Sequence, residues 1–226
     1  LPTFSGTGIL NGSVSIDTID FSAFTTPVTL DMSAGTASAA GVFLTLVDIE
    51  KLVGGGGDDT LISGPTDEVL VGGAGNDTFI FADNWGNDII FEYDGEGLDT
   101  IDFSGASAEL TFTLGSLITT DAYGNVATYS GDSIENLLGG ASDDLIKFGV
   151  DGVTFAGGLG SIDGGGGINT LDYSVYTTGV VVDLELGTAT GTAGVTNIRN
   201  VIGGSGADVL TGDGLVELFL RLGQHL

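Results

Sequence analysis

Three consecutive nine-residue units, from Gly54 to Ile80, constrain the fold more than any other feature of the chain. They read GGGGDDTLI (54–62), SGPTDEVLV (63–71) and GGAGNDTFI (72–80). The first and third fit the nonapeptide G-G-x-G-x-D-x-U-x, where U is a large apolar residue, and begin 18 residues apart. Such a unit combines a glycine-rich turn with a very short strand, so the pattern makes Ca²⁺ binding the first functional hypothesis.

The charge of the chain is strongly negative, with 31 Asp and Glu against 4 Lys and Arg and a formal net charge of −27. Binding to a polyphosphate backbone requires several Lys or Arg contacts, so this composition excludes nucleic acid as a ligand. An anionic membrane surface or polysaccharide is disfavoured for the same reason. A compact chain of this charge repels itself, so it either stays open or is neutralised by cations.

Disorder is the alternative for an acidic, glycine-rich chain. Hydrophobic residues make up 42% of the sequence and the mean hydropathy is +0.37, which is unlike the composition of disordered segments. We expect order in the presence of Ca²⁺ and disorder without it. The chain has no cysteine, so it forms neither disulfides nor thiolate metal sites. No apolar run reaches the roughly 18 residues of a membrane span. Because neither a signal-peptide pattern nor an initiator Met is present, we interpret the sequence as a fragment or a processed chain.

A longer repeat overlies the nonapeptides and occurs three times. Its openings lie at 16–22, 98–104 and 168–174, and its closings, each containing Gly-Gly, lie at 48–61, 133–146 and 197–210. Helix-favouring patterns are nearly absent, and self-similarity of this kind marks a solenoid, in which each coil packs only against its neighbours. We therefore predict an all-β fold, a right-handed parallel β-roll or β-helix with irregular longer coils, extending over residues 1–214.

Two further patterns predict local structure. Segments 28–38 and 180–190 have alternating apolar positions and glycine, which indicates extended strands joined by Gly turns. Leu61, Leu70 and Phe79 occupy the U position nine residues apart, so we expect all three to point into the core.

The last segment, 215–226, allows two interpretations. Its apolar residues have helical spacing, which predicts a short amphipathic helix capping the open end. The alternative is an irregular strand or a truncated further coil that begins at 212–214. The apolar residues are Leu215, Leu218, Phe219, Leu222 and Leu226.

The chemistry of the glycine-aspartate loops fits a hard cation. Ca²⁺ takes six to eight oxygen ligands, and glycine lets a turn bend sharply so that backbone carbonyls approach the ion. One loop cannot complete this shell, and loops 18 residues apart lie on the same side, so we expect Asp59 and Asp77 to share an ion. The candidate ligand residues of this pair are Gly54, Gly55, Gly56, Gly57, Asp58 and Asp59, with Gly72, Gly73, Ala74, Gly75, Asn76 and Asp77.

These loops resemble the RTX (repeats-in-toxin, or haemolysin-type) calcium-binding family, and the resemblance extends over roughly residues 16–214. It implies a parallel β-roll with Ca²⁺ in the turns and type I secretion from a Gram-negative cell. A third match is Gly203, Gly204, Gly206 and Asp208, and a weaker loop keeps Gly139, Asp143 and Asp144.

Other units depart from the pattern, so we expect a few well-formed sites rather than a continuous row of ions. Unit 63–71 offers Glu68, unit 157–162 has Ile162 in place of Asp, and unit 164–172 has Asn169. The degenerate loops are equally well interpreted as tight turns without an ion. A further acidic group is interpreted either as secondary ligands or as solvated turn carboxylates; it consists of Asp88, Asp94, Asp99 and Asp102.

Catalysis is not expected, because the single histidine, His225, is next to last in the chain and a Ser-His-Asp arrangement has no other imidazole. We predict instead a secreted structural or adhesive module, from a surface layer, filament or large adhesin, that folds on binding extracellular Ca²⁺. Its partners are Ca²⁺, further copies of itself or a surface component. The alternative is the calcium-dependent carrier module of a secreted hydrolase.

Overall fold

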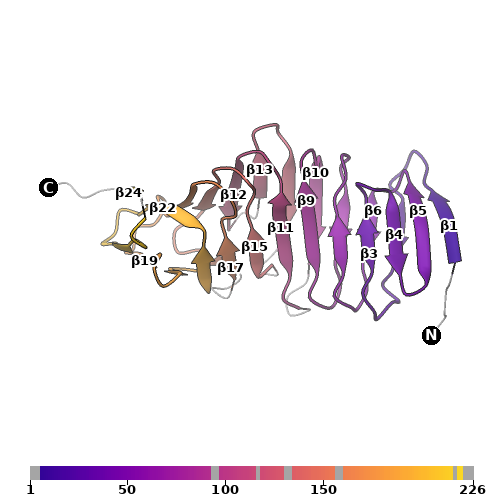
Figure 1. The fold of residues 1–226 in the computed structure, drawn as a ribbon, viewed down its shortest axis with the longest axis horizontal. Helices are drawn as coiled ribbons and strands as arrows, with labels where there is room; N and C mark the ends of the chain where they lie inside the picture. Colours follow the sequence, from indigo (N-terminus) through magenta and orange to yellow (C-terminus); the bar gives the residue numbers. More distant parts are fainter. Residues whose placement is uncertain are drawn as a thin grey trace.

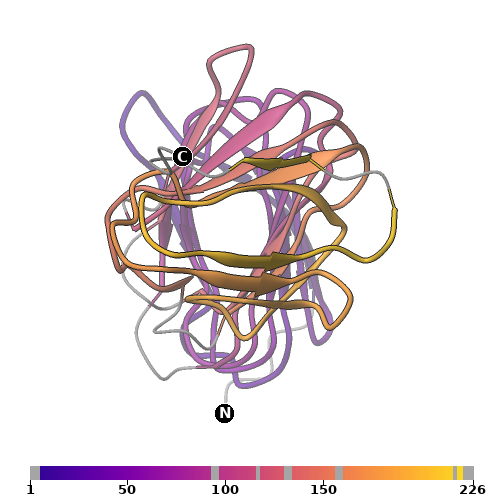
Figure 2. The ribbon, with the colours of Figure 1, turned by 90° about the vertical axis from the view of Figure 1, so that its left-hand side faces the viewer.

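The computed structural model describes residues 6–92, 97–115, 118–129, 134–155, 160–215 and 218–220. They form short β-strands stacked along the long axis of the molecule, from β1 (Gly6–Asn11) at one end to β24 (Leu218–Leu220) at the other (Figure 1). Seen along this axis, the strands lie around a common core (Figure 2). The described strands and turns agree with the predicted all-β fold. No helix in the described part of the chain has the length and apolarity needed to cross a membrane.

Most strands belong to two sheets, and neighbours in the stack are mainly parallel. The 10-stranded sheet contains, in spatial order, β1, β5 (Val42–Val47), β4 (Thr36–Ala39), β3 (Thr29–Asp31), β7 (Thr60–Ile62), β9 (Thr78–Ala82), β11 (Thr100–Gly105), β15 (Asn136–Leu138), β17 (Ser161–Asp163) and β21 (Gly194–Thr196). The 11-stranded sheet contains β2 (Thr18–Asp20), β6 (Lys51–Val53), β8 (Val69–Val71), β10 (Asn87–Phe91), β14 (Val126–Tyr129), β13 (Ile118–Asp121), β12 (Leu110–Leu114), β16 (Leu145–Phe148), β18 (Asn169–Asp172), β22 (Ile198–Ile202) and β24. A 3-stranded sheet contains β20 (Thr188–Ala189), β19 (Val181–Asp183) and β23 (Val209–Thr211).

The nonapeptide period sends successive strands alternately to the two large sheets. β7 and β9 pair in parallel with Leu61 opposite Phe79, while β8 between them pairs with β6 in the other sheet, with Leu52 opposite Leu70. Leu61, Leu70 and Phe79 are all 0% exposed, which confirms that the U positions point inward. In a three-residue strand only the central side chain faces the core, so one large apolar residue per unit builds the interior.

The three long units share a local structure. In each opening, a buried aromatic residue (Phe21, Phe103 or Tyr173) accepts a backbone hydrogen bond from the residue three positions later. Antiparallel hairpins follow: β3 with β4, β12 with β13 and β19 with β20. The first and third hairpins confirm the extended segments predicted at 28–38 and 180–190, and their turns contain glycines with positive φ.

The C-terminal segment contains a strand where a capping helix was one of two expectations. β24 pairs in parallel with β22, with Phe219 opposite Val201. The helical interpretation is therefore wrong for Leu218–Leu220. The open edge of β22 offers backbone hydrogen-bond partners, and these outweigh the helical spacing of the leucines, which is a weak preference in so short a segment. Residues 216–217 and 221–226 lie outside the described part.

Candidate metal centre

Loops 54–59 and 72–77 lie on top of one another, as the 18-residue spacing predicts, and residues 97–99 follow as the next layer. We call these three segments the first loop stack. Ala74 N–H donates to the carbonyl of Gly55 at 2.9 Å, and Thr78 N–H donates to the carbonyl of Asp59 at 2.9 Å. Asn76 N–H donates to Asp58 Oδ1 at 2.8 Å on the exposed side of the stack.

The glycines allow this close stacking. Gly73 has φ of +108° and Gly75 has φ of +123°, both in a region that L-residues avoid. A Cβ atom at Gly73 would also collide with the carbonyl oxygen of Gly55, and one at Gly54 with that of Gly72. Gly57 has equally little space, because a side chain there would meet the backbone at Thr26 and Pro27.

Asp59 and Asp77 link the layers but differ in how their oxygens are used. Asp59 accepts hydrogen bonds from the N–H groups of Val28 at 2.9 Å and Gly55 at 2.5 Å, one on each carboxylate oxygen. Asp77 Oδ1 accepts from Asp59 N–H at 2.7 Å, but its buried Oδ2 has no hydrogen-bond partner. Asp77 N–H in turn donates to Asp99 Oδ1 at 2.7 Å. Both oxygens of Asp59 therefore accept protein hydrogen bonds and brace its loop. Asp77 Oδ2 accepts none and can coordinate an ion.

Asp77, Glu92 and Asp99 form a cluster of three buried carboxylates, with one oxygen of each lying within 4.8 Å of the others. Asp77 comes from loop 72–77, and Glu92 and Asp99 come from the layer above it. Glu92 Oε1 accepts from Gly72 N–H at 2.7 Å. Burial, aided by the charges of Asp59 and Asp99 and opposed by the hydrogen bond from Asp59 N–H, raises the pKa of Asp77 to about 7. Burial and the charges of Asp99 and Asp77 raise the pKa of Glu92 to about 8. The protein alone thus disfavours full ionisation of this cluster.

The cluster fits Ca²⁺. Ligands on opposite sides of a Ca²⁺ ion are roughly 4.6–5.2 Å apart, since each lies about 2.3–2.6 Å from it, and these carboxylate oxygens fall inside that limit. All the side-chain donors are hard oxygens, which suits Ca²⁺ rather than a thiophilic metal. The buried Asp77 Oδ2 supplies an acceptor that nothing else in the described part of the chain uses. When bound, the ion would supply the positive charge that stabilises the ionised carboxylates.

Sequence reasoning overlooked Glu92 and treated Asp99 only as a secondary candidate. Only the strand register places these residues. Phe91 lies opposite Val71, so Glu92 lies in the layer above Gly72. Likewise Thr100 lies opposite Thr78, so Asp99 follows Asp77 in the stack. Asp102, of the same acidic group, instead accepts a hydrogen bond from Ser104 N–H at 2.7 Å as a turn carboxylate. Asp94 lies outside the described residues.

The opposite row of turns contains a second acidic pair, Glu68 and Asp88. Glu68 N–H donates to Asp88 Oδ1 at 2.7 Å, and the hydroxyl of Ser63 donates to Asp88 Oδ2 at 2.6 Å. Burial raises the pKa of Asp88 to about 8, against the opposing effect of the Ser63 hydrogen bond. Glu68 thus takes the aspartate position of the degenerate unit 63–71. Because both oxygens of Asp88 already accept hydrogen bonds, this pair is less suited to a cation than the Asp77 cluster.

Loops 139–144 and 164–169 and residues 195–199 form a second loop stack of similar construction. Asp144 accepts from Leu110 N–H at 2.8 Å and from Gly140 N–H at 2.7 Å, as Asp59 does from Val28 and Gly55. Burial raises the pKa of Asp144 to about 6. Asp143 Oδ1 accepts from Ile168 N–H at 2.8 Å, and a Cβ atom at Gly139 would meet the Gly164 carbonyl.

The loop 203–208 lies against the opening turn of the third long unit. Asp208 Oδ1 accepts from Val180 N–H at 3.0 Å, while its buried Oδ2 has no hydrogen-bond partner. The glycines of this loop leave no room for side chains: a Cβ atom at Gly203 would meet the Asp208 carboxylate, one at Gly204 the Tyr176 backbone and one at Gly206 the Thr178 backbone. Asp59, Asp144 and Asp208 therefore hold equivalent positions in the three long units.

Stacked glycine turns, buried carboxylates and parallel three-residue strands are the features of a metal-binding all-β protein. A model of the RTX calcium-binding nonapeptide repeat matches residues 48–79 and 200–214, in four copies. The matched segments are thus RTX calcium-binding nonapeptide repeats, and repeats of this kind bind Ca²⁺, are generally structural and are typical of secreted proteins. The matched residues include loops 54–59, 72–77 and 203–208. No match was found among curated proteins.

Proposed function

We propose that this protein is a secreted, calcium-stabilised structural module whose first loop stack folds on binding extracellular Ca²⁺. The observation that supports this most directly is the buried, unpartnered Oδ2 of Asp77 within a group of three carboxylates. Buried charges need partners, and an uncompensated cluster of this kind opposes folding. A divalent cation removes that penalty and also reduces the self-repulsion of a chain with net charge −27.

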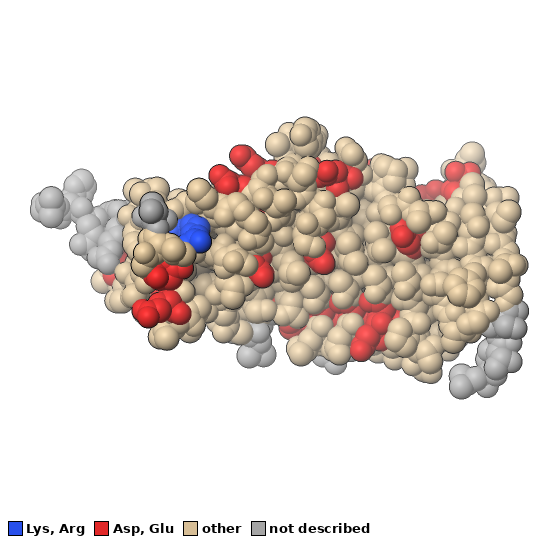
Figure 3. Space-filling model, viewed as in Figure 1, with Lys and Arg blue, Asp and Glu red and all other residues tan. Residues whose placement is uncertain are grey.

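The protein itself offers little positive charge to replace the ion. Acidic side chains are distributed along the face shown in Figure 3, and the one basic patch visible on it lies near its C-terminal end. Arg199 and Asp213 form the one ion pair recorded among the described residues. We assign the ion to Asp77, Glu92 and Asp99, with the turns at 54–59 and 72–77 bracing it, and a further, weaker site to the Asp208 loop.

Coupled binding and folding follows from this assignment. Extracellular modules bind Ca²⁺ with Kd values of about 10⁻⁴–10⁻³ M, so low Ca²⁺ leaves the first loop stack open and millimolar Ca²⁺ folds it. A 100-fold excess of ion over its Kd stabilises the folded state by about 2.7 kcal/mol per site. The folded form that we propose is a right-handed coil of stacked strands over the described residues up to 214, with β24 as part of a truncated further coil.

The structural role that we propose is that of a spacer or adhesive element in a surface layer, extracellular filament or large adhesin. Among the described strands, β1 and β24 are edge strands of the two large sheets at opposite ends of the stack, and such edges can pair with further strands. Self-association end to end is the simplest use of them. Secretion by a type I route belongs to the same proposal.

A Ca²⁺ titration followed by far-ultraviolet circular dichroism tests the calcium-dependent core of the proposal. We expect a cooperative gain of β-signal between EGTA and several millimolar Ca²⁺, with Mg²⁺ at the same concentrations as the matched control. Mg²⁺ should give little gain, because it prefers a smaller octahedral shell and retains its water. An unchanged spectrum across the Ca²⁺ titration, or an equal response to Mg²⁺, would overturn it.

A further inference from the structure

Asp77 occupies the same position in the first loop stack as Asn169 does in the second. Asp77 Oδ1 accepts from the N–H of Asp59 at 2.7 Å, and Asn169 Oδ1 accepts from the N–H of Asp144 at 2.8 Å. Both side chains are fully buried. In each case the residue donating the N–H is the aspartate that braces the preceding loop. The two positions can therefore be compared atom by atom.

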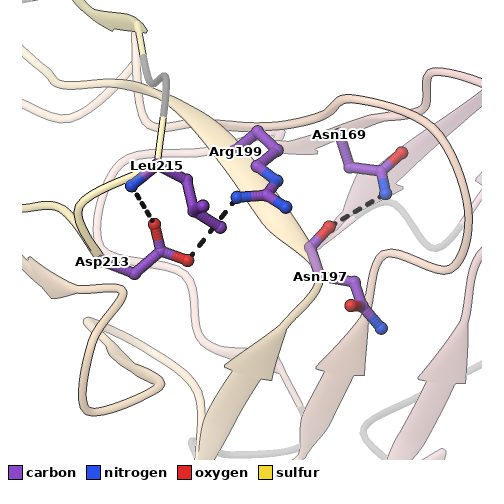
Figure 4. A network of polar contacts seen from close by, with 5 residues as sticks. All are labelled: Asn169, Asn197, Arg199, Asp213 and Leu215. Carbon is purple, nitrogen blue, oxygen red and sulfur yellow. Dashed lines mark hydrogen bonds and ion pairs between the residues drawn. The ribbon is translucent and has the colours of Figure 1, made fainter.

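The second terminal atom distinguishes them. Asp77 ends in an oxygen that has no hydrogen-bond partner. Asn169 ends in Nδ2, which donates to the carbonyl of Gly166 at 2.8 Å. It also donates to the carbonyl of Asn197 at 2.9 Å (Figure 4). The amide orientation is fixed because the N–H of Asp144 requires an oxygen opposite it. Two N–H groups thus satisfy backbone carbonyls within the second stack, where a cation would otherwise be needed to bridge oxygens.

Arg199 is a second departure, at the layer that follows Asn169. The closing motifs read D-I-E-K at 48–51, S-I-E-N at 133–136 and N-I-R-N at 197–200, so arginine replaces glutamate only in the third. In the first two units this glutamate accepts a hydrogen bond from the N–H of the opening aspartate: Glu50 from Asp17 at 2.9 Å and Glu135 from Asp99 at 2.8 Å. In the third unit the opening residue is Asn169.

Each acidic pair, Asp17 with Glu50 and Asp99 with Glu135, therefore corresponds to a neutral and a cationic residue in the third unit. The guanidinium of Arg199 lies 3.6 Å from Asp213, and both side chains are about one-third exposed. Figure 4 shows Arg199 beside Asn197, whose carbonyl accepts from Asn169. The local charge at this layer changes from that of two carboxylates to that of one cation.

We infer that Asn169 and Arg199 take the place of a bound cation in the second loop stack, so that this stack excludes Ca²⁺ and is held together without it. The inference rests on the proposed function, since it divides a calcium-binding chain into a dependent and an independent part. Both oxygens of Asp144 and all the polar atoms of the Asn169 amide have protein partners. No oxygen of these two side chains is left for an ion, and Arg199 repels one.

Restoring the acidic residues tests the inference on the full chain. We expect Asn169→Asp/Arg199→Glu to bind one more Ca²⁺ per chain than the wild type in equilibrium dialysis, at the same saturating concentration. Asn200→Asp is the control, because it adds a negative charge beside the same stack while keeping the oxygen that accepts from Leu218 N–H at 3.1 Å. An unchanged number of ions in a double variant that folds in Ca²⁺ would overturn the inference.

Hydrogen exchange on the wild type tests it without any variant. In EGTA, the amides of Asp144, Gly166 and Thr170, which bond between layers of the second stack, should keep protection within about threefold of their value in Ca²⁺. The amides of Asp59, Thr78 and Thr100 in the first stack should lose about tenfold or more. Equal loss in both stacks would overturn the inference and leave the proposed function standing. Full protection of the first stack in EGTA would instead overturn the proposed function.

Discussion

The first and second loop stacks are built on the same plan and differ in what neutralises their turns. In both, an aspartate braces a glycine loop, and the next layer accepts the N–H of that aspartate. The first stack continues with Asp77, Glu92 and Asp99, and the second with Asn169 and Arg199. Replacement of one oxygen by an N–H group changes a site that needs a cation into one that satisfies its own carbonyls.

A repeat sequence can therefore retain a fold while changing its dependence on a ligand. The strands on either side keep their parallel register, with Leu61 opposite Phe79 in one region and Ile146 opposite Leu171 in the other. The same backbone arrangement thus accommodates a carboxylate at Asp77 in one stack and an amide at Asn169 in the other. A buried carboxylate cluster costs stability until an ion is bound, which makes folding conditional, whereas the amide makes it unconditional.

Truncation of core side chains should have the largest effect on stability, and that effect should depend on Ca²⁺ only in the first stack. Phe79 and Leu171 are both 0% exposed, and removing such side chains costs about 3–5 kcal/mol for Phe→Ala and about 2–5 kcal/mol for Leu→Ala. We expect Leu171→Ala to lower the melting temperature in EGTA and in Ca²⁺ alike. Phe79→Ala should lower it only in Ca²⁺, because the first stack is already open in EGTA. Calorimetry in both buffers measures this, and a lowered transition for Phe79→Ala in EGTA would contradict the division into two regions.

Asp77→Asn should give the first stack the amide that the second stack has at the equivalent position, Asn169. Asparagine keeps the oxygen that accepts from Asp59 N–H and removes one of three negative charges. The Ca²⁺ midpoint should rise by about tenfold, equivalent to about 1.4 kcal/mol, because ligand charge sets affinity in such sites. Asp102→Asn is the matched control, since Asp102 accepts only a turn hydrogen bond from Ser104. If both variants shift the midpoint equally, net charge rather than the cluster controls binding.

Acidification should partly replace Ca²⁺ in the first stack. The pKa values of Asp77, about 7, and Glu92, about 8, are raised in the folded state, so the ion-free fold binds protons more tightly than the unfolded chain. The destabilisation is complete above about pH 8, decreases as the pH falls through both values, and disappears below the ordinary carboxyl pKa near 4.

We therefore expect the β-signal in EGTA to rise as the pH is lowered from 8 to 6, measured by circular dichroism at constant ionic strength. Glu92→Gln keeps an oxygen for Gly72 N–H and lacks the titrating group, so its rise should be smaller. A rise of the same size in this variant would show that the general loss of charge, and not the cluster, is responsible.

The sequence was sufficient for the loops and the inward residues because both follow local rules. Glycine pairs followed by aspartate predict the turns, and the nine-residue period predicts that Leu61, Leu70 and Phe79 face the core. The carboxylate cluster is not local: Glu92 reaches Asp77 only through the pairing of β10 with β8. The exchange of Asp for Asn169 was visible in the sequence, but the two carbonyls that its amide satisfies lie 3 and 28 residues away.

The C-terminal leucines illustrate a different limit. Their helical spacing was compatible with a cap, and only the neighbouring edge of β22 decides for a strand at Leu218–Leu220. A preference this weak yields to tertiary pairing, since a short helix has little stability of its own. The sequence was compatible with a helix and with a strand, and the open edge of β22 favours the strand.

The smallest effect that we predict concerns the ion pair between Arg199 and Asp213, and it separates two ways in which Arg199 can act. The Nη1–Oδ2 distance is 3.6 Å with both side chains about one-third exposed, so the pair itself contributes about 0–1 kcal/mol. Asp213→Asn keeps the oxygen that accepts from Leu215 N–H at 3.0 Å and removes the charge. Protection of the Thr170 amide in EGTA should change by less than about threefold, because Arg199 still lies beside the second stack. Arg199→Glu, which removes the guanidinium, is measured alongside. An equal loss of protection in the two variants would mean that the guanidinium acts through Asp213 and not in place of a cation.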